Sequence, residues 1–190
     1  MLAHRACQRI GWLTLLVCFL YGARSAPAQE IETLKHAVVR VLTQKDGVAK
    51  TGTGFVVSVT PDIVHIVTAT HVVQGAQTIE VEFFAKRDTP LRAKVGKMED
   101  DSQRGIAYLV VTTPAPAGTR ALTLAPQVKL SEGSEEVLTL GFPQGAPGWS
   151  PKSLKFATRD GRELLFDGKV NEGNSGGPLL KNGEVVGMVQ

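Results

Sequence analysis

The sequence has little cysteine: Cys7 and Cys18 are the only two in its 190 residues. Both lie in the first 28 residues, whose composition is that of a leader removed after export. A mature chain without cysteine has no disulfide to stabilise it, unlike many small secreted domains. The roughly 160 residues that remain are enough for one compact domain with its own hydrophobic core. We therefore expect the fold to depend on that core.

The segment 1–28 is predicted to be a secretory signal peptide. Arg5 and Arg9 form a basic start, an apolar run follows over 10–21, and the small residues Ala26-Pro27-Ala28 offer a cleavage site. A membrane anchor is the alternative, but the apolar run is shorter than the ~20 residues that a spanning helix needs. We expect a secreted or periplasmic protein that keeps no stable membrane anchor after cleavage.

The rest of the chain lacks an excess of charge of either sign. The whole sequence carries 21 basic and 18 acidic residues, and three of the basic ones, Arg5, Arg9 and Arg24, belong to the predicted signal peptide. The remaining basic and acidic residues therefore balance. A protein that binds nucleic acid needs a surplus of positive charge against the phosphates. A nucleic-acid partner is not expected.

The sequence also lacks any long segment with helical periodicity, beyond a short helical turn at 30–35. Short runs rich in β-branched residues recur instead, separated by Gly, Pro and Asp turns, which is typical of a β-barrel or sandwich. A Pro/Ala segment at 112–118 is the best candidate for a linker. The predicted strands are 37–42, 52–59, 63–68, 78–84, 91–97, 106–111, 121–124, 136–141, 153–157, 163–166, 179–180 and 184–189.

The stretch Gly173-Asn174-Ser175-Gly176-Gly177-Pro178 is the strongest candidate for a functional motif. Glycine tolerates positive φ and close backbone approach, so Ser175 would lie on a tight turn with an exposed hydroxyl and outward N–H groups. A catalytic nucleophile needs that arrangement. An ordinary Gly/Ser/Asn turn between two strands is the alternative from these residues alone.

No histidine follows Ser175, and this excludes the α/β-hydrolases, in which the histidine comes after the serine. The opposite order stays open. His4 belongs to the signal peptide, His36 precedes the first strand, and His65 lies within a strand, whereas His71 follows a strand where a loop would present it. No Cys/His spacing suggests a metal site. We expect neither a metal nor a cofactor.

Four stretches together resemble a trypsin-like serine protease, most closely the bacterial HtrA/Deg-type branch. The resemblance implies an all-β fold of two antiparallel β-barrels, the first over 29–113 with His71 and the second over 114–190 with Ser175. The second barrel is expected to be incomplete at its C-terminal end. The four stretches are Thr51-Gly52-Thr53-Gly54-Phe55, Val67-Thr68-Ala69-Thr70-His71-Val72-Val73, Gly141-Phe142-Pro143-Gln144-Gly145 and Asn171-Glu172-Gly173-Asn174-Ser175-Gly176-Gly177-Pro178-Leu179.

The same resemblance implies roles for particular residues. His71 would be the general base and Ser175 the nucleophile, and the N–H groups of Gly173 and Ser175 would form the oxyanion hole. Lys169 would lie near the floor of the primary specificity pocket and favour an acidic substrate side chain; a solvated lysine pointing outward is the alternative. The implied activity is that of a serine endopeptidase with a protein or peptide substrate.

The pattern departs from the family at the third triad member. The family carries its orienting aspartate at the start of a strand, and the matching position here is Gly105. The nearest acids are Asp100 and Asp101; the latter is our candidate, and a solvated acidic loop is the alternative. Loss of the orienting acid costs roughly 10⁴ in kcat, or about 5.5 kcal/mol. The second hypothesis is therefore a catalytically impaired trypsin-like domain that binds proteins.

Overall fold

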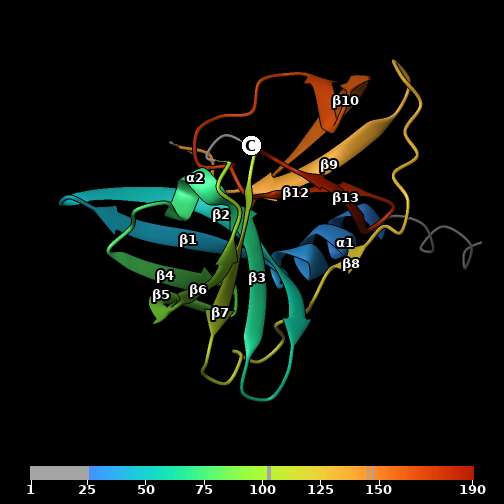
Figure 1. Cartoon of the computed structure of the whole chain (residues 1–190). Coiled ribbons are helices and arrows are strands. Elements are labelled where there is room, and N and C mark those ends of the chain that lie inside the picture. Colours follow the sequence, from blue (N-terminus) through green and yellow to red (C-terminus); the bar gives the residue numbers. More distant parts are fainter. Residues whose placement is uncertain (1–25, 102–103, 145, 147) are drawn as a thin grey trace, which may run out of the picture.

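The computed structural model describes residues 26–101, 104–144, 146 and 148–190. Most of the predicted signal peptide, with Cys7 and Cys18, lies outside these residues. No helix in the described part of the chain is long and apolar enough to cross a membrane. Figure 1 shows an N-terminal helix beside two β-sheets.

Strands are the predominant regular structure of the described chain, and only two short helices occur in it, so the all-β prediction is confirmed. The predicted helical turn at 30–35 is the end of a longer helix, in which Pro27 stands in the first turn, where proline is tolerated. The elements are α1 (Ala26–Lys35), β1 (Val38–Lys45), β2 (Val48–Val59), β3 (Val64–Ala69), α2 (Thr70–Val73), β4 (Thr78–Phe83), β5 (Lys86–Arg92), β6 (Lys94–Met98), β7 (Ile106–Val111), β8 (Thr123–Leu124), β9 (Glu136–Gly141), β10 (Ser150–Asp160), β11 (Glu163–Asp167), β12 (Pro178–Lys181) and β13 (Glu184–Met188).

The first sheet has seven strands in the order β5-β4-β1-β2-β3-β7-β6. Its two edge strands, β5 and β6, are joined by the single residue Ala93, so the sheet must curl until its edges meet (Figure 1). We predicted one strand over 91–97, and this was wrong. The chain pairs with β4 up to Arg92 and with β7 from Lys94, because it turns the corner of the barrel at Ala93.

Alternation of side chains along the strands fills this barrel. Val39 and Val41 of β1 and Val64 and Ile66 of β3 are fully buried, while the intervening residues of β1 are partly exposed or lie on the other face. Successive side chains of a strand point to opposite faces. Each fully buried valine or isoleucine contributes about 1.5–3 kcal/mol relative to exposure. The interior of the first barrel therefore needs no disulfide.

The second sheet has six strands in the order β11-β10-β9-β12-β13-β8. All of its pairings are antiparallel except that of β13 with the short β8, which is parallel. The division that we predicted between residues 113 and 114 falls in the segment between β7, the last strand of the first sheet, and β8. The described strands of this sheet leave β11 and β8 as its edges.

A shared core joins the two sheets. Phe55 and Val67 of the first sheet belong to the same buried cluster as Leu140 of β9 and the loop residues Phe142 and Trp149. The indole N–H of Trp149 donates to the Val38 carbonyl of β1 at 2.8 Å. The strand ends that carry the motifs are thus held against one another.

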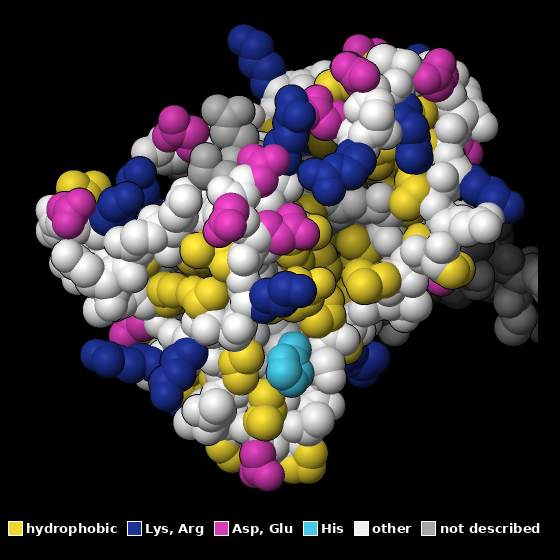
Figure 2. Space-filling view, viewed as in Figure 1, with side chains coloured by type: hydrophobic (Ala, Val, Ile, Leu, Met, Phe, Trp, Pro, Cys, Tyr) yellow, Lys and Arg dark blue, Asp and Glu magenta, His cyan; other side chains and the backbone are white. Residues whose placement is uncertain are grey.

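On the face seen in Figure 2, acidic and basic side chains are interspersed around exposed hydrophobic ones.

Candidate active site

His71 lies on α2, a helix of four residues that directly follows β3. The N–H of Thr70 donates to the Gly105 carbonyl at 2.9 Å, which ties the start of α2 to the chain entering β7. Thr70 and Val73 are buried and anchor the helix, whereas His71 is exposed. The helix therefore presents His71 at the end of the first barrel.

Ser175 lies in the turn before β12, and this turn is bonded to the first sheet. The N–H of Thr53 in β2 donates to the Ser175 carbonyl at 2.8 Å. The Thr53 hydroxyl donates to the Gly173 carbonyl at 2.7 Å and accepts from the Phe142 N–H at 3.2 Å. Thr53 thus connects the serine turn, the end of β9 and the first barrel.

Two glycines of this turn admit no side chain. Gly173 has φ of +93° and Gly176 has φ of +85°, a region that L residues rarely adopt. A Cβ at Gly173 would lie 2.1 Å from the Phe142 carbonyl oxygen, and one at Gly176 would lie 2.1 Å from the Thr53 carbonyl oxygen. Backbone contacts on both sides of Ser175 therefore require glycine.

Hydrogen bonds fix the two peptide groups whose N–H groups we expect to bind an oxyanion. The Glu172 carbonyl accepts from the Gln144 N–H at 2.8 Å, and the Asn174 carbonyl accepts from the Gly177 N–H at 2.8 Å. A trans peptide directs its N–H opposite to its C=O. The N–H groups of Gly173 and Ser175 thus point away from these partners, and neither donates a backbone hydrogen bond within the described residues.

The imidazole of His71 has a neighbouring cation. Partial burial, and then the nearby ammonium group of Lys50, lower the pKa of His71 below its ordinary 6.5. A carboxylate near an imidazole would raise the pKa, and none contributes to this shift. Over the described ranges, the structure has no hydrogen bond from His71 to Ser175 or to an acid.

From the sequence we expect the aspartate of the family pattern at position 105, where this chain has glycine. The Gly105 N–H donates to the Asp101 carbonyl at 2.8 Å. A Cβ at Gly105 would lie 2.2 Å from that carbonyl oxygen and 2.7 Å from the Thr70 hydroxyl oxygen. The backbone of Asp101 thus fills the space in which a side chain at position 105 would begin.

The Asp101 carboxylate bonds within its own loop, where it accepts from the Arg104 N–H at 2.9 Å. The loop is linked to the second sheet by the ion pair between Arg104 and Glu163, with an N–O distance of 2.5 Å. Asp101 is therefore close in the fold to Thr70, the neighbour of His71, but the structure does not bring its carboxylate into a hydrogen bond with His71. Its catalytic role stays a prediction.

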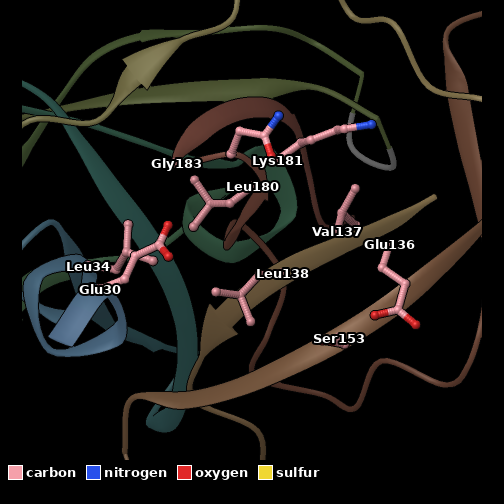
Figure 3. Close-up of a pocket in the computed structure, with 10 residues that line it drawn as sticks. Glu30, Leu34, Glu136, Val137, Leu138, Ser153, Leu180, Lys181 and Gly183 are labelled. Carbon is pink, nitrogen blue, oxygen red and sulfur yellow. The ribbon is translucent and has the colours of Figure 1, made fainter. Parts of the chain in front are cut away.

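Lys169 is exposed, and its carbonyl oxygen accepts from the Lys152 ammonium group. A separate pocket of about 250 Å³ lies between α1 and the second sheet. Leu34, Leu138 and Leu180 are among its lining residues, while His71, Lys169 and Ser175 are not (Figure 3). The candidate catalytic residues therefore lie outside this pocket. No group of three potential metal ligands occurs in the part of the chain that the structure describes.

The sequence and fold have clear relatives. A family model, the trypsin-like peptidase domain, matches residues 52–188.

The chain belongs to the trypsin-like peptidase family.

A putative serine protease, HhoB of Synechocystis, is 30% identical over 150 residues, or 73% of this chain and 33% of HhoB. The serine endoprotease of Yersinia pestis has a similar fold, with a TM-score of 0.69 and 23% identity over 88% of this chain and 58% of that one. The HtrA-type protease AlgW with a tripeptide gives a TM-score of 0.68 at 24% identity, covering 86% of this chain and 54% of its own. The expected trypsin-like, HtrA/Deg-type fold is therefore confirmed.

The chain spans only a third of the length of HhoB and little more than half of the two crystallised chains. Within the trypsin-like domain, sequence reasoning missed two residues of interest. Thr53 belongs to the stretch 51–55, which indicates no role for it, although its hydrogen bonds join three segments of the chain. Lys50 lies immediately before that motif, and its charge affects the pKa of His71. Its position next to the motif was the one signal in the sequence that could have pointed to it.

Proposed function

We propose that this chain is an exported serine endopeptidase that hydrolyses peptide bonds in proteins or peptides. Family membership supports the class of activity. Export follows from the predicted signal peptide and would place the enzyme in the periplasm or outside the cell. The relatives that carry a serine protease name support the same class.

In the proposed mechanism, His71 removes the hydroxyl proton of Ser175 as the oxygen attacks the scissile carbonyl. The C–N bond then breaks, and the imidazolium returns the proton to the leaving amine. Water, deprotonated by the same imidazole, hydrolyses the acyl-enzyme and regenerates Ser175. A lowered pKa keeps His71 neutral at pH 7, which is the form that a general base requires.

The observation that carries the proposal is the fixed orientation of the two peptides around Ser175. With the Glu172 and Asn174 carbonyls held on one side, the N–H groups of Gly173 and Ser175 remain as donors for a developing oxyanion. Removal of one such donor typically costs about 3 kcal/mol of transition-state stabilisation. A turn whose only task is to reverse the chain needs neither orientation.

For the orienting acid we propose Asp101, acting as a positioning residue for His71. Its backbone fills the space beside Gly105 and close to Thr70, so the loop brings a carboxylate to the side of α2 from which the family aspartate acts. In this role the Asp101 side chain would leave the Arg104 N–H, which it accepts from in the structure, and bond to the imidazole. Lys169 is proposed to select an acidic side chain on the acyl side of the cleaved bond.

A second candidate function is a trypsin-like binding module without turnover. Two observations favour it. The backbone of Asp101 fills the space where a side chain at position 105 would begin, and burial and Lys50 are the causes of the pKa shift of His71. In this case Ser175 and its turn would serve to hold a peptide.

A fluorophosphonate probe separates the two functions because it reacts with an activated serine. We expect stoichiometric labelling of the wild type and none of Ser175→Ala. Ser134→Ala is the matched control, since Ser134 is exposed and bonds only within its own turn at 3.3 Å. Labelling that persists in folded Ser175→Ala, or that is absent from the folded wild type, overturns the endopeptidase.

A further inference from the structure

The hairpin of β1 and β2 carries one continuous face that changes character along its length. Side chains at alternate positions of a strand share a face, and directly paired residues of antiparallel strands do so too. In the register of this hairpin Val41 pairs with Gly52, Thr43 with Lys50 and Lys45 with Val48. The first pair is buried in the barrel, whereas Lys50, Lys45 and Val48 are exposed. Beyond the barrel interior this face becomes solvent-exposed and carries Lys45 and Lys50, which we call the basic strip.

The same face contacts the segment that carries His71. A Cβ at Gly52 would lie 2.5 Å from Val72, the residue after His71. A Cβ at Gly75, just beyond α2, would lie 2.9 Å from the ammonium nitrogen of Lys45. Figure 1 shows α2 alongside this hairpin, with the turn between β1 and β2 projecting beyond it. Lys45 and Lys50 therefore flank α2 as two cations on one surface.

Neither lysine is neutralised by an acid. Among the residues that the structure describes, no ion pair involves Lys45 or Lys50. Asp46, at the hairpin turn, is contacted instead by the Gln77 amide at 3.5 Å. The charge of Lys50 reaches His71, because it contributes to lowering the pKa of that residue. Two unpaired cations beside a general base give a positive field at the place of reaction.

We propose that Lys45 and Lys50 form a subsite for acidic side chains on the leaving-group side of the cleaved bond. The inference rests on the proposed endopeptidase function. In that mechanism His71 donates a proton to the leaving amine, so the substrate segment after the cleaved bond must lie next to His71 and α2. An aspartate or glutamate within the first three residues of that segment then meets the basic strip.

A peptide library tests the preference. The full chain is incubated with decapeptides randomised at every position, and the new N-termini are sequenced by mass spectrometry. We expect Asp and Glu to be enriched about three- to fivefold over Asn and Gln in the first three residues after the cleaved bond, the size of an exposed ion pair. The enrichment should fall at 0.5 M salt, where charges are screened.

Charge-reversal variants assign the preference to these lysines. Lys50→Glu and Lys45→Glu should each abolish the enrichment, whereas Lys94→Glu should leave it unchanged. Lys94 is exposed on β6 and pairs with Val110, at the opposite end of β7 from α2. The acid-to-amide ratio is taken within each variant, so altered basicity of His71 cancels. Equal cleavage before acidic and neutral residues in the wild type overturns the subsite.

Binding to Ser175→Ala separates failure of the subsite from failure of the endopeptidase. Fluorescein-labelled Ala-Ala-Ala-Asp-Asp-Ala and Ala-Ala-Ala-Asn-Asn-Ala are compared by anisotropy, with and without Lys50→Glu. Tighter binding of the acidic peptide that is lost on Lys50→Glu supports the subsite even without turnover. If binding is equal while the wild type still cleaves proteins and reacts with fluorophosphonate, the subsite fails and the endopeptidase stands. Absent fluorophosphonate labelling would instead remove the endopeptidase.

Discussion

The two halves of the candidate active site are constrained very differently. Around Ser175, backbone oxygen atoms lie 2.1 Å from where Cβ atoms would be at Gly173 and Gly176. Thr53 donates two hydrogen bonds to the turn and accepts a third from Phe142. Around His71, a helix of four residues carries an exposed imidazole, and the family acid is replaced by Gly105. The serine turn is fixed by backbone contacts, whereas no hydrogen bond in the described part of the chain orients the His71 imidazole.

This difference indicates where a trypsin-like site tolerates change. Gly173 and Gly176 of the serine turn are packed against the backbone of other segments, so a side chain added at either position would disturb the turn. The proposed acid, Asp101, lies on a loop, and a loop can supply a carboxylate from another position in the chain. Substitutions in each half test whether the histidine half still acts with the serine half.

Removal of the nucleophile or the base should have the largest effect. If the two halves act as one unit, Ser175→Ala and His71→Ala each lower kcat by at least ~10⁴, and the double variant is no slower than either single one. Initial rates of casein hydrolysis by purified, folded protein measure this. Losses that add up in the double variant would mean that the histidine half works independently.

Asp101→Asn comes next. If Asp101 positions His71, we expect kcat to fall by as much as ~10⁴ with KM nearly unchanged, since the substrate does not touch this residue. Asp100→Asn is the control, on the same loop, and should stay within about twofold of the wild type. Asp101→Glu should restore part of the rate. Equal activity of the two asparagine variants would leave a Ser–His dyad without an acid.

The sequence predicted the fold well because a strand has a local signal, a short run rich in β-branched residues that is bounded by turn residues. The segments 106–111 and 136–141 are strands with the expected bounds. The strand predicted over 91–97 was wrong, since alternation along the chain does not reveal that the pairing partner changes at Ala93.

For the site, sequence motifs identified the residue types but not their contacts. The three bonds of Thr53 join segments about 90 to 120 residues apart, and no local pattern encodes them. The obstruction at Gly105 arises from the path of a loop rather than from the residue itself. Both are properties of tertiary packing, which a single sequence does not display.

Restoring the family residue by Gly105→Asp should not restore a triad. Its Cβ would meet the Asp101 carbonyl oxygen at 2.2 Å, and backbone cannot move away cheaply, so we expect a loss of about 2–4 kcal/mol in the free energy of unfolding. Gly133→Ala is the control, because its Cβ meets nothing within 4 Å and only its φ of +68° is strained; we expect about 1 kcal/mol. Urea denaturation measures both. A stable Gly105→Asp protein with raised kcat would contradict this account.

The smallest effect concerns the pH dependence of the histidine half. Because burial and Lys50 lower the pKa of His71, the acidic limb of kcat/KM should lie below pH 6.5, the value of an unperturbed imidazole, as long as the Asp101 carboxylate stays bonded to the Arg104 N–H. Lys50→Gln removes one cause, so the limb should move toward higher pH, and added salt should move the wild type in the same direction. In the unfolded chain the His71 imidazole binds its proton at a higher pH than in the folded protein. This residue therefore lowers the free energy of unfolding as the pH falls below 6.5 through the folded pKa. An acidic limb above pH 6.5 in the wild type that falls below 6.5 in Asp101→Asn would show that the Asp101 carboxylate turns to His71 as proposed, because a carboxylate raises the pKa of an imidazole.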